Sequence, residues 1–329
     1  MEKLYVGLDV SKDTLDVTLR RAGKNQSHQV VANDAMGITQ LIKMLVKQKA
    51  EQVHACLEAT GQYGDEVAER LYAQGYAVSV VNPLCTKSYA KARSVRNQTD
   101  KVDAGLLAAY AETQQPRLWV PPSPLHKRLR ALSRHIDDLE CTRQAQRNRY
   151  QASKHLDPLV RQSLETVIAC LTAELTATKQ ALRELLDQDP ELKRQKELLM
   201  SIKGVGELTA VRFLAELGDL REFADARQLA AFLGLTPEFK TSGKSVSTKP
   251  RLSKRGNAAV RKILYMPAVS AKNTNPIVRA FCARLALSRK CDMSLIGAAM
   301  HKLAHLMFGV VHSGVPFDPD YLTQPRFAS

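Results

Sequence analysis

Short apolar runs alternate with amphipathic stretches over the first 82 residues, which is typical of an α/β domain. The pattern predicts strands over 4–10, 14–20, 28–33, 53–60 and 76–83, and helices over 37–48 and 64–75. The first run is buried, and the alternation in the second predicts a partly exposed strand. An antiparallel meander of three strands followed by αβαβ and a further helix is the ribonuclease H-like order, with helices on the faces of one sheet.

The pattern changes after the proline-rich segment 119–124. Leucines spaced three and four residues apart predict a long, coiled-coil-like helical hairpin that bends at Pro158 and ends before Pro190. A pair of helices this long has little to bury its apolar stripe against within one chain, so we expect it to pack on another protomer. A hairpin folded onto its own domain is the alternative. We therefore expect domains over 1–120, 121–200 and 201–329.

The third region is mostly helical and begins with "SIKGVGELTAVRFLAELG" at 201–218. Gly204 and Gly206 precede a predicted helix, as in a helix-hairpin-helix turn, where glycines let backbone N–H groups approach a phosphate. A simple tight turn is the alternative reading. A basic segment follows in the sequence, and this favours DNA contact that does not depend on base sequence.

The net charge of +15 is concentrated in the C-terminal third of the chain. No acidic residue lies between Glu238 and Asp292. A solvated surface normally mixes its charges, so this segment indicates binding to a polyphosphate such as nucleic acid. The candidate contacts, closely spaced in the sequence, are Lys240, Lys244, Lys249, Arg251, Lys254, Arg255, Arg261 and Lys262.

The spacing of the cysteines and the hydropathy of the chain argue against a disulfide-rich, zinc-binding or membrane protein. The six cysteines form no CxxC pair and no zinc-like pattern, so we expect reduced thiols. We find no apolar run approaching the roughly 18 residues that span a bilayer. We therefore expect a cytoplasmic protein without a membrane partner.

Four carboxylates occupy unusual places. Asp9 closes an apolar strand and Glu58 closes another, where acidic residues are rare. Asp100 and Asp103 stand at the start of a helical pattern, in "NQTDKVDAGLLA". A helix cap, with Asp100 as the N-cap residue, explains the second pair equally well when it is taken alone. If the two strands are neighbours, however, all four side chains can meet at one end of the sheet.

Four adjacent carboxylates require a cation, because each close pair repels by about 4 kcal/mol at an effective dielectric near 20. Oxygen ligands without His or Cys favour Mg²⁺ or Mn²⁺. Two such ions about 4 Å apart stabilise the attacking and leaving oxygens in phosphodiester chemistry. With the basic C-terminal third, this predicts an enzyme that acts on nucleic acid.

Long motifs around these residues resemble one family. "GLDVSKDTLDV", "CLEATGQYGDEVAERLYAQGYAVSVVNP" and "RNQTDKVDAGLLA" are similar to the DEDD transposases of insertion sequences, a group described as bridge-RNA-guided recombinases. "IKGVGELTA", "FADARQLAAFLGLTP" and "LSKRGNAAVRKILYMPA" resemble that family's C-terminal transposase domain, so the resemblance covers nearly the whole chain.

The resemblance implies a RuvC-like domain that carries Asp9, Glu58, Asp100 and Asp103, and a C-terminal domain with a nucleophilic serine. In "KTSGKSVSTKP" the matching position is Ser242, with Ser245 and Ser247 as alternatives. It also implies a covalent phosphoserine intermediate, donor and target DNA, a guide RNA, and a dimer or tetramer associated with the nucleoid of a prokaryote. A RuvC-like nuclease that hydrolyses DNA without a covalent intermediate is the main alternative, and a non-catalytic DNA-binding protein is a third.

Overall fold

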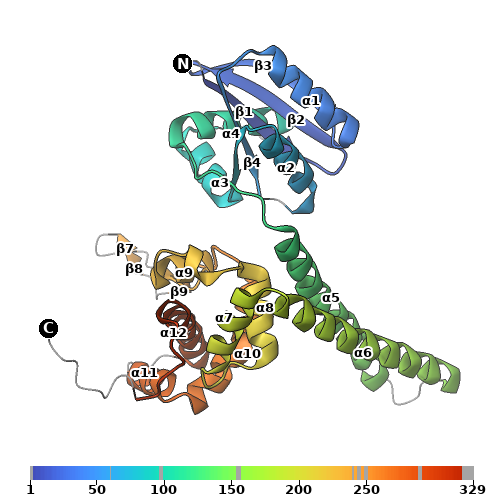
Figure 1. The fold of residues 1–329 in the computed structure, drawn as a ribbon, viewed down its shortest axis with the longest axis vertical. Coiled ribbons are helices and arrows are strands. Elements are labelled where there is room, and N and C mark those ends of the chain that lie inside the picture. The colour runs from blue at the N-terminus through green and yellow to red at the C-terminus, as the bar shows by residue number, and fades with distance from the viewer. Residues whose placement is uncertain are drawn as a thin grey trace. The chain divides into compact units, whose positions relative to one another are not determined.

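The computed structural model describes residues 3–59, 61–95, 99–152, 157–238, 241–242, 246–247, 251–287 and 291–320. Contacts between residues divide the chain into two compact units, Met1–Pro122 and Ser123–Ser329. Figure 1 shows a sheet with flanking helices in the first unit, and helices with a few two-residue strands in the second.

The first unit is built on a five-stranded sheet in the order β3-β2-β1-β4-β5. β1, β2 and β3 form the predicted antiparallel meander, and β4 and β5 run parallel to β1. The strands are β1 (Lys3–Val10), β2 (Thr14–Arg21), β3 (Lys24–Ala32), β4 (Gln52–Glu58) and β5 (Ala77–Val81). The mixed α/β composition and the five strands predicted from the sequence are confirmed.

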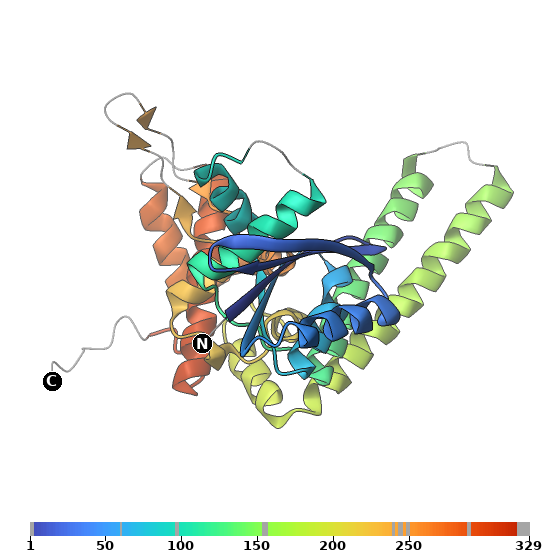
Figure 2. The ribbon, with the colours of Figure 1, turned by 90° about the horizontal axis from the view of Figure 1, so that it is seen from above.

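Helices cover both faces of this sheet. α1 (Ala35–Lys47) and α2 (Asp65–Ala73) lie on one face, with the short 3-10 turn η1 (Gln62–Gly64) before α2, and α3 (Pro83–Ala92) and α4 (Asp100–Gln114) lie on the other (Figure 2). Because side chains alternate along a strand, Leu4, Val6 and Leu8 of β1 pack in the core with α1 and α2. Tyr5 packs on the opposite face with Leu107 and Ala111 of α4.

α4 lies directly on β1 at Gly7. A Cβ atom placed on Gly7 would stand 1.8 Å from the backbone oxygen of Ala104 and 2.5 Å from the nitrogen of Ala108. Only glycine fits between two backbones this close. This contact fixes where the first turn of α4 lies relative to the end of β1.

β2 differs from the prediction of a partly exposed strand, because all its central residues are buried. α4 covers its second face, so the polar row Asp16, Thr18 and Arg20 lies under that helix rather than in water. The Arg20 guanidinium donates to the Glu112 carboxylate of α4 at 2.6 Å. The alternation in β2 correctly predicted one apolar face and one polar face, but α4 covers the polar face.

The second unit begins with the predicted helical hairpin. Its helices are α5 (Pro124–Ala152), α6 (Pro158–Asp187), α7 (Pro190–Met200), α8 (Glu207–Leu217), α9 (Ala226–Phe232), α10 (Ala258–Thr274), α11 (Pro276–Ala286) and α12 (Asp292–Ser313). Leu129, Ile136 and Leu182 near the base of the hairpin are fully buried in the core of this unit. Towards the bend, Leu159 and Val167 are exposed.

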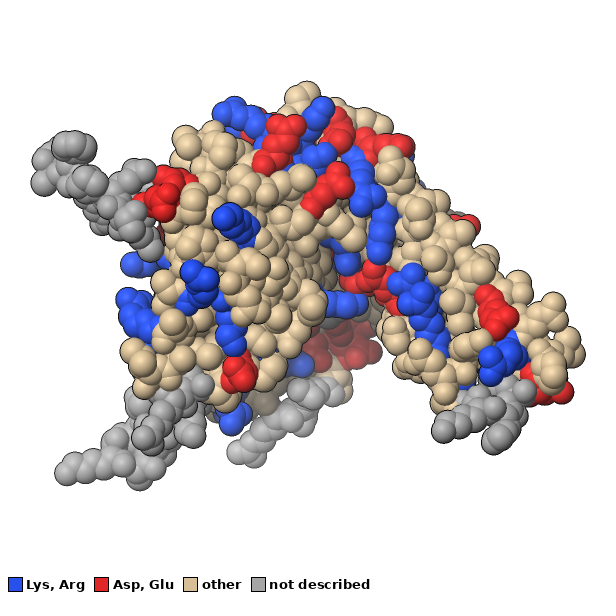
Figure 3. All heavy atoms as spheres, turned by 90° about the horizontal axis from the view of Figure 1, so that it is seen from below, with Lys and Arg blue, Asp and Glu red and all other residues tan. Residues whose placement is uncertain are grey.

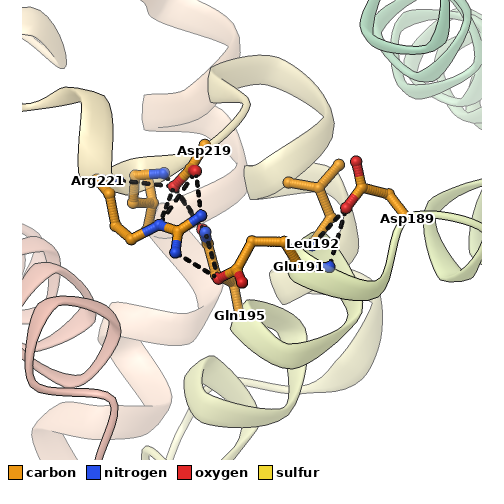
Figure 4. Close-up of polar contacts among 7 residues, drawn as sticks. Asp189, Glu191, Leu192, Gln195, Asp219 and Arg221 are labelled. Atoms are coloured by element: carbon orange, nitrogen blue, oxygen red, sulfur yellow. Dashed lines mark hydrogen bonds and ion pairs between the residues drawn. The ribbon is translucent and has the colours of Figure 1, made fainter.

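A polar network joins α7 to the segment that follows α8. The Gln195 amide of α7 donates to Asp219 at 2.6 Å, and its oxygen accepts from the backbone of Leu220 at 3.2 Å (Figure 4). Leu220 begins η2 (Leu220–Glu222), which follows α8, and Arg221 binds both Asp219 and Glu191. Since Gln195 is completely buried, these bonds tie α7 to the chain beyond α8.

α12 corrects one expectation. By length and composition alone this helix could cross a membrane, with a mean hydropathy of 1.4 over its most apolar 18 residues. Half of that window is buried, and Leu303, Ala304 and Met307 are completely enclosed in the core of the second unit. The sequence pattern did not predict a long apolar helix here because His301, Lys302 and His305 interrupt the apolar residues. Its burial identifies it as a core helix.

Candidate active site

The fold brings two strand-end carboxylates together. β1 and β4 are neighbouring parallel strands, and their register pairs Leu8 with Leu57, so Asp9 and Glu58 come next on each strand. Both have the parity of the residues that face α4, Tyr5 on β1 and Cys56 on β4. The sheet therefore presents both carboxylates at the same end and on the same face.

α4 brings the second pair. Asp100 and Asp103 lie in its first turn, and the seating of Ala104 on Gly7 directs this end of the helix towards the end of β1. The N-cap residue is Thr99, whose hydroxyl accepts from the Val102 amide at 3.3 Å. The alternative that Asp100 is the N-cap is therefore wrong. Because Thr99 caps the helix, both aspartate carboxylates remain available to the cluster.

The four carboxylates interact electrostatically. Burial, followed by the charges of Asp103, Asp100, Glu58 and Asp16, raises the pKa of Asp9 to about 6. Burial and then the charges of Glu58 and Asp100 raise the pKa of Asp103. Burial and the neighbouring negative charges both disfavour the ionised carboxylates, which is unfavourable unless protons or a cation compensate for it.

The donor set suits a hard divalent cation, since it offers carboxylate oxygens and no sulfur or imidazole. Within the part of the chain that the structure describes, no three His, Cys, Asp or Glu side chains form a group that could hold a metal ion as they stand. The four residues thus form a coupled cluster at the sheet end rather than a closed coordination shell.

Two further contacts beside this cluster were missed by the sequence analysis. The hydroxyl of Thr86, on α3, donates to the Glu58 carboxylate. Asp16 is the cross-strand partner of Asp9, and its carboxylate binds the His28 ring at 2.8 Å. The alternation of β2 gave a signal for Asp16, since it places the residue on a polar row. No pattern in the sequence distinguishes Thr86.

The serine loop is described only in part. Thr241–Ser242 (β7) and Val246–Ser247 (β8) form a two-stranded ladder in which Ser242 pairs with Val246. Beside them, Pro237–Glu238 (β6) pairs with Arg251–Leu252 (β9). Side chains at 241–250 are outside the described part, and so are Lys240, Lys244, Ser245 and Lys249 altogether.

The basic residues that are described divide into two groups. Arg251, Lys254 and Arg255 are exposed, although Arg255 pairs with Glu238 at 3.1 Å. Arg261 donates to the carbonyl oxygens of Leu233 and Gly256, both at 3.0 Å, and Lys262 pairs with Asp137 of α5 at 2.7 Å. Arg261 is therefore bonded to the backbone of its own unit, whereas Lys262 is an exposed side chain that also forms an ion pair.

On one face of the molecule, acidic side chains accompany basic ones. Figure 3 shows Lys and Arg interspersed with Asp and Glu on the face that it draws. The two glycines of the predicted helix-hairpin-helix turn also differ. Gly204 has a φ of +103° and lies so close to α10 that a Cβ would come within 2.8 Å of Ala271. Gly206 is the N-cap of α8, without a side-chain cap, and faces open space.

The burial of Asp9 beside other negative charges predicts a stability effect. Its raised pKa means that the folded state binds this proton more tightly than the unfolded state does, so the carboxylate opposes folding increasingly as the pH rises from about 4 to 6. Asp9→Asn should therefore raise the melting temperature in EDTA at pH 7.5, and this gain should shrink towards pH 4.5. Thermal unfolding across that range measures it. The exposed carboxylate in Glu51→Gln is the control, and a pH-independent difference for Asp9→Asn would contradict the prediction.

Comparison with known proteins shows which family the chain resembles. A transposase model of the DEDD type matches residues 6–161, and a model described as "Transposase IS116/IS110/IS902 family" matches residues 196–283. The pilin gene-inverting protein of Moraxella bovis is 30% identical over 321 residues, which is 97% of this chain and 98% of that protein.

More distant similarities extend the comparison. The transposase for insertion sequence element IS1111A of Coxiella burnetii is 25% identical, and the match covers 79% of this chain and 75% of that protein. The solved structure of T. thermophilus RuvC in complex with Holliday junction substrate overlaps 36% of this chain and 99% of that one, at 13% identity and a TM-score of 0.26, which is too low to identify a fold. From the two family models and the full-length relative, this chain belongs to the IS116/IS110/IS902 transposase family, whose members are enzymes of DNA strand transfer.

Proposed function

We propose that this protein is the transposase of an insertion sequence, a site-specific recombinase that cuts and rejoins DNA through a covalent phosphoserine intermediate. The observation that carries the proposal is the coupled cluster of Asp9, Glu58, Asp100 and Asp103 at one end of the sheet. In this reading the first unit is a RuvC-like catalytic domain. Its strand order and the helix across β1 support that assignment.

The four carboxylates would hold Mg²⁺ or Mn²⁺, and two ions suit their number and charge. Such ions, when bound, supply positive charge to the phosphodiester and assist loss of the proton from the attacking hydroxyl. The chain's own contribution is to place the oxygen ligands. Gly7 admits α4 close to β1, and Thr99 caps the helix so that Asp100 and Asp103 remain free for this role.

Ser242 is the proposed nucleophile. A serine hydroxyl attacks poorly at neutral pH, so it needs help in losing its proton while the charge on the phosphate is neutralised. Its oxygen would form a bond to phosphorus while one DNA strand leaves with a free hydroxyl. The covalent bond conserves the phosphodiester energy, so a second strand can displace the serine without ATP. A composite site, with the carboxylates from one protomer and the serine from another, is part of this proposal.

The name of one relative supports rejoining over simple hydrolysis. The Moraxella relative is named as a gene-inverting protein, and inversion requires that cut strands be joined again.

The exposed side chains of Arg251 and Lys254 would hold DNA or a bridge RNA through the backbone phosphates, with Gly206 at the uncapped start of α8. The hairpin α5–α6 would join protomers through the apolar residues exposed towards its bend. The protein would work with the nucleoid in the cytoplasm of a prokaryote.

A covalent adduct tests the proposal directly. Protein is incubated with Mg²⁺, labelled DNA that spans the element junction, and RNA transcribed from the flanking non-coding sequence, and the mixture is then denatured. Wild type should carry label on the protein, and Ser242→Ala should lose it completely because the attacking oxygen is gone.

Ser245→Ala and Ser247→Ala are the matched controls and should keep the adduct. If DNA is cut without any adduct, the protein is a RuvC-like nuclease that hydrolyses its substrate. If omission of the RNA leaves adduct formation at the same site and rate, the guide-RNA part of the proposal is wrong.

A further inference from the structure

Glu58 is the carboxylate of the cluster with a fixed, buried partner. The hydroxyl of Thr86 donates to Glu58, and only 1% of the Thr86 residue is exposed. The carbonyl oxygen of Pro83, 2.9 Å from the same hydroxyl, is a second acceptor that shares its single proton. Burying a polar side chain this deeply destabilises the fold unless it forms hydrogen bonds. One partner of Thr86 is a carboxylate of the candidate site.

The backbone around Thr86 is built to hold this contact. Glu58 pairs with Val81 at the last rung of the β4–β5 ladder, and the Ala59 amide donates to the Val81 carbonyl at 2.8 Å. α3 begins two residues later, with Asn82 as its N-cap and Pro83 in its first turn. Thr86 stands one turn into this helix, so the sheet register itself sets its distance from Glu58.

The position of Glu58 matters to the rest of the cluster. Its charge contributes to the raised pKa of both Asp9 and Asp103, so its carboxylate interacts with both aspartates. A glutamate has three side-chain torsions, and repulsion from its neighbours favours rotamers that point away from them. A hydrogen bond from a buried hydroxyl opposes that movement.

We propose that Thr86 is a positioning residue, which holds the Glu58 carboxylate in the orientation that receives a divalent cation. This inference rests on the proposed function, since it assumes that the four carboxylates bind such an ion. Thr86 touches neither DNA nor cation and acts only through Glu58. Groups that orient metal ligands typically change metal affinity about 10- to 100-fold when they are removed.

Thr86→Val tests the proposal, because valine keeps the shape of threonine and lacks the hydroxyl. Mn²⁺ binding to the full-length protein, measured by electron paramagnetic resonance without DNA, should weaken about 10- to 100-fold. Thr86→Ser restores the hydroxyl and should recover most of the wild-type affinity. In cleavage assays Thr86→Val should need more Mn²⁺ for half-maximal rate, with little change in the rate at saturation.

A double-mutant cycle separates positioning from packing. In a Glu58→Gln background, Thr86→Val should cause no further loss of Mn²⁺ affinity, because the carboxylate that it orients is absent. If Thr86→Val does not fold, the comparison of Thr86→Ser with Thr86→Ala carries the same test. Wild-type Mn²⁺ affinity in Thr86→Val, or equal losses in the valine and serine variants, would overturn the proposal. If wild type and Asp9→Asn bind Mn²⁺ equally, the metal site itself is wrong and the inference about Thr86 falls with it.

Discussion

Asp103→Asn is expected to lower DNA strand cleavage about 100- to 1000-fold while leaving DNA binding nearly unchanged. Asparagine keeps the size of aspartate but removes one negative charge from a cluster in which burial, and then the charges of Glu58 and Asp100, raise the pKa of this residue. The chemistry fails because the cation loses a charged ligand. In the proposed function DNA binding depends on exposed basic side chains such as Lys254, so it should persist.

The assay compares the rate of strand cleavage with the retention of the same labelled DNA in a mobility shift. Glu51→Gln makes the same change of charge at an exposed position before β4, at the opposite end of that strand from Glu58, and should cleave like wild type. Wild-type cleavage by Asp103→Asn would remove this residue from the metal site. Loss of DNA binding in parallel with cleavage would indicate damage to the fold.

Gly7→Ala is expected to destabilise the first unit by about 3 kcal/mol, at the upper end of what overpacking costs. The added methyl group would lie 1.8 Å from the backbone oxygen of Ala104, and a helix backbone cannot turn aside as a flexible side chain can. α4 must therefore move off β1 and carry Asp103 away from Asp9. We expect cleavage to be lost in the fraction of molecules that remains folded.

Urea unfolding measures the change in stability, and the cleavage assay reports on the displaced carboxylates. Gly309→Ala is the matched control, because it adds a methyl group to an exposed position of α12 with nothing within 4 Å. That substitution should be neutral or stabilising, by up to about 1 kcal/mol, since alanine favours helix over glycine. If Gly7→Ala unfolds at the wild-type urea concentration and cleaves DNA normally, α4 does not need its close contact with β1.

Much of the first unit could be predicted because its strands are local patterns. The apolar run at β1 and the alternation at β2 place their side chains on defined faces, whatever the rest of the chain does. The positions of Asp9 and Glu58 at strand ends follow from the same patterns. What could not be predicted is which element covers the polar row of β2. That depends on where α4, more than 80 residues later in the sequence, packs against the sheet.

The predicted basic contacts stay a prediction, and the structure adds the intramolecular partners that some of these residues have. Charge along the sequence identified a segment without acidic residues, but Lys262 finds its partner at Asp137, far away on α5. Arg261 donates hydrogen bonds to two backbone carbonyl groups of its own unit. Local charge counts cannot predict such ion pairs and hydrogen bonds, because the partners lie far apart in the sequence.

By itself the sequence determined the kinds of element, the strand-end carboxylates and the excess positive charge, because periodicity and composition are local properties of the chain. Only the tertiary structure decided that Thr99 caps α4, that Gly7 admits this helix, and that Thr86 reaches Glu58. Each of these depends on a close approach between side chains or backbones set by sheet register and helix packing. Such contacts leave no periodic signal in the sequence, since a single glycine or threonine suffices to make them.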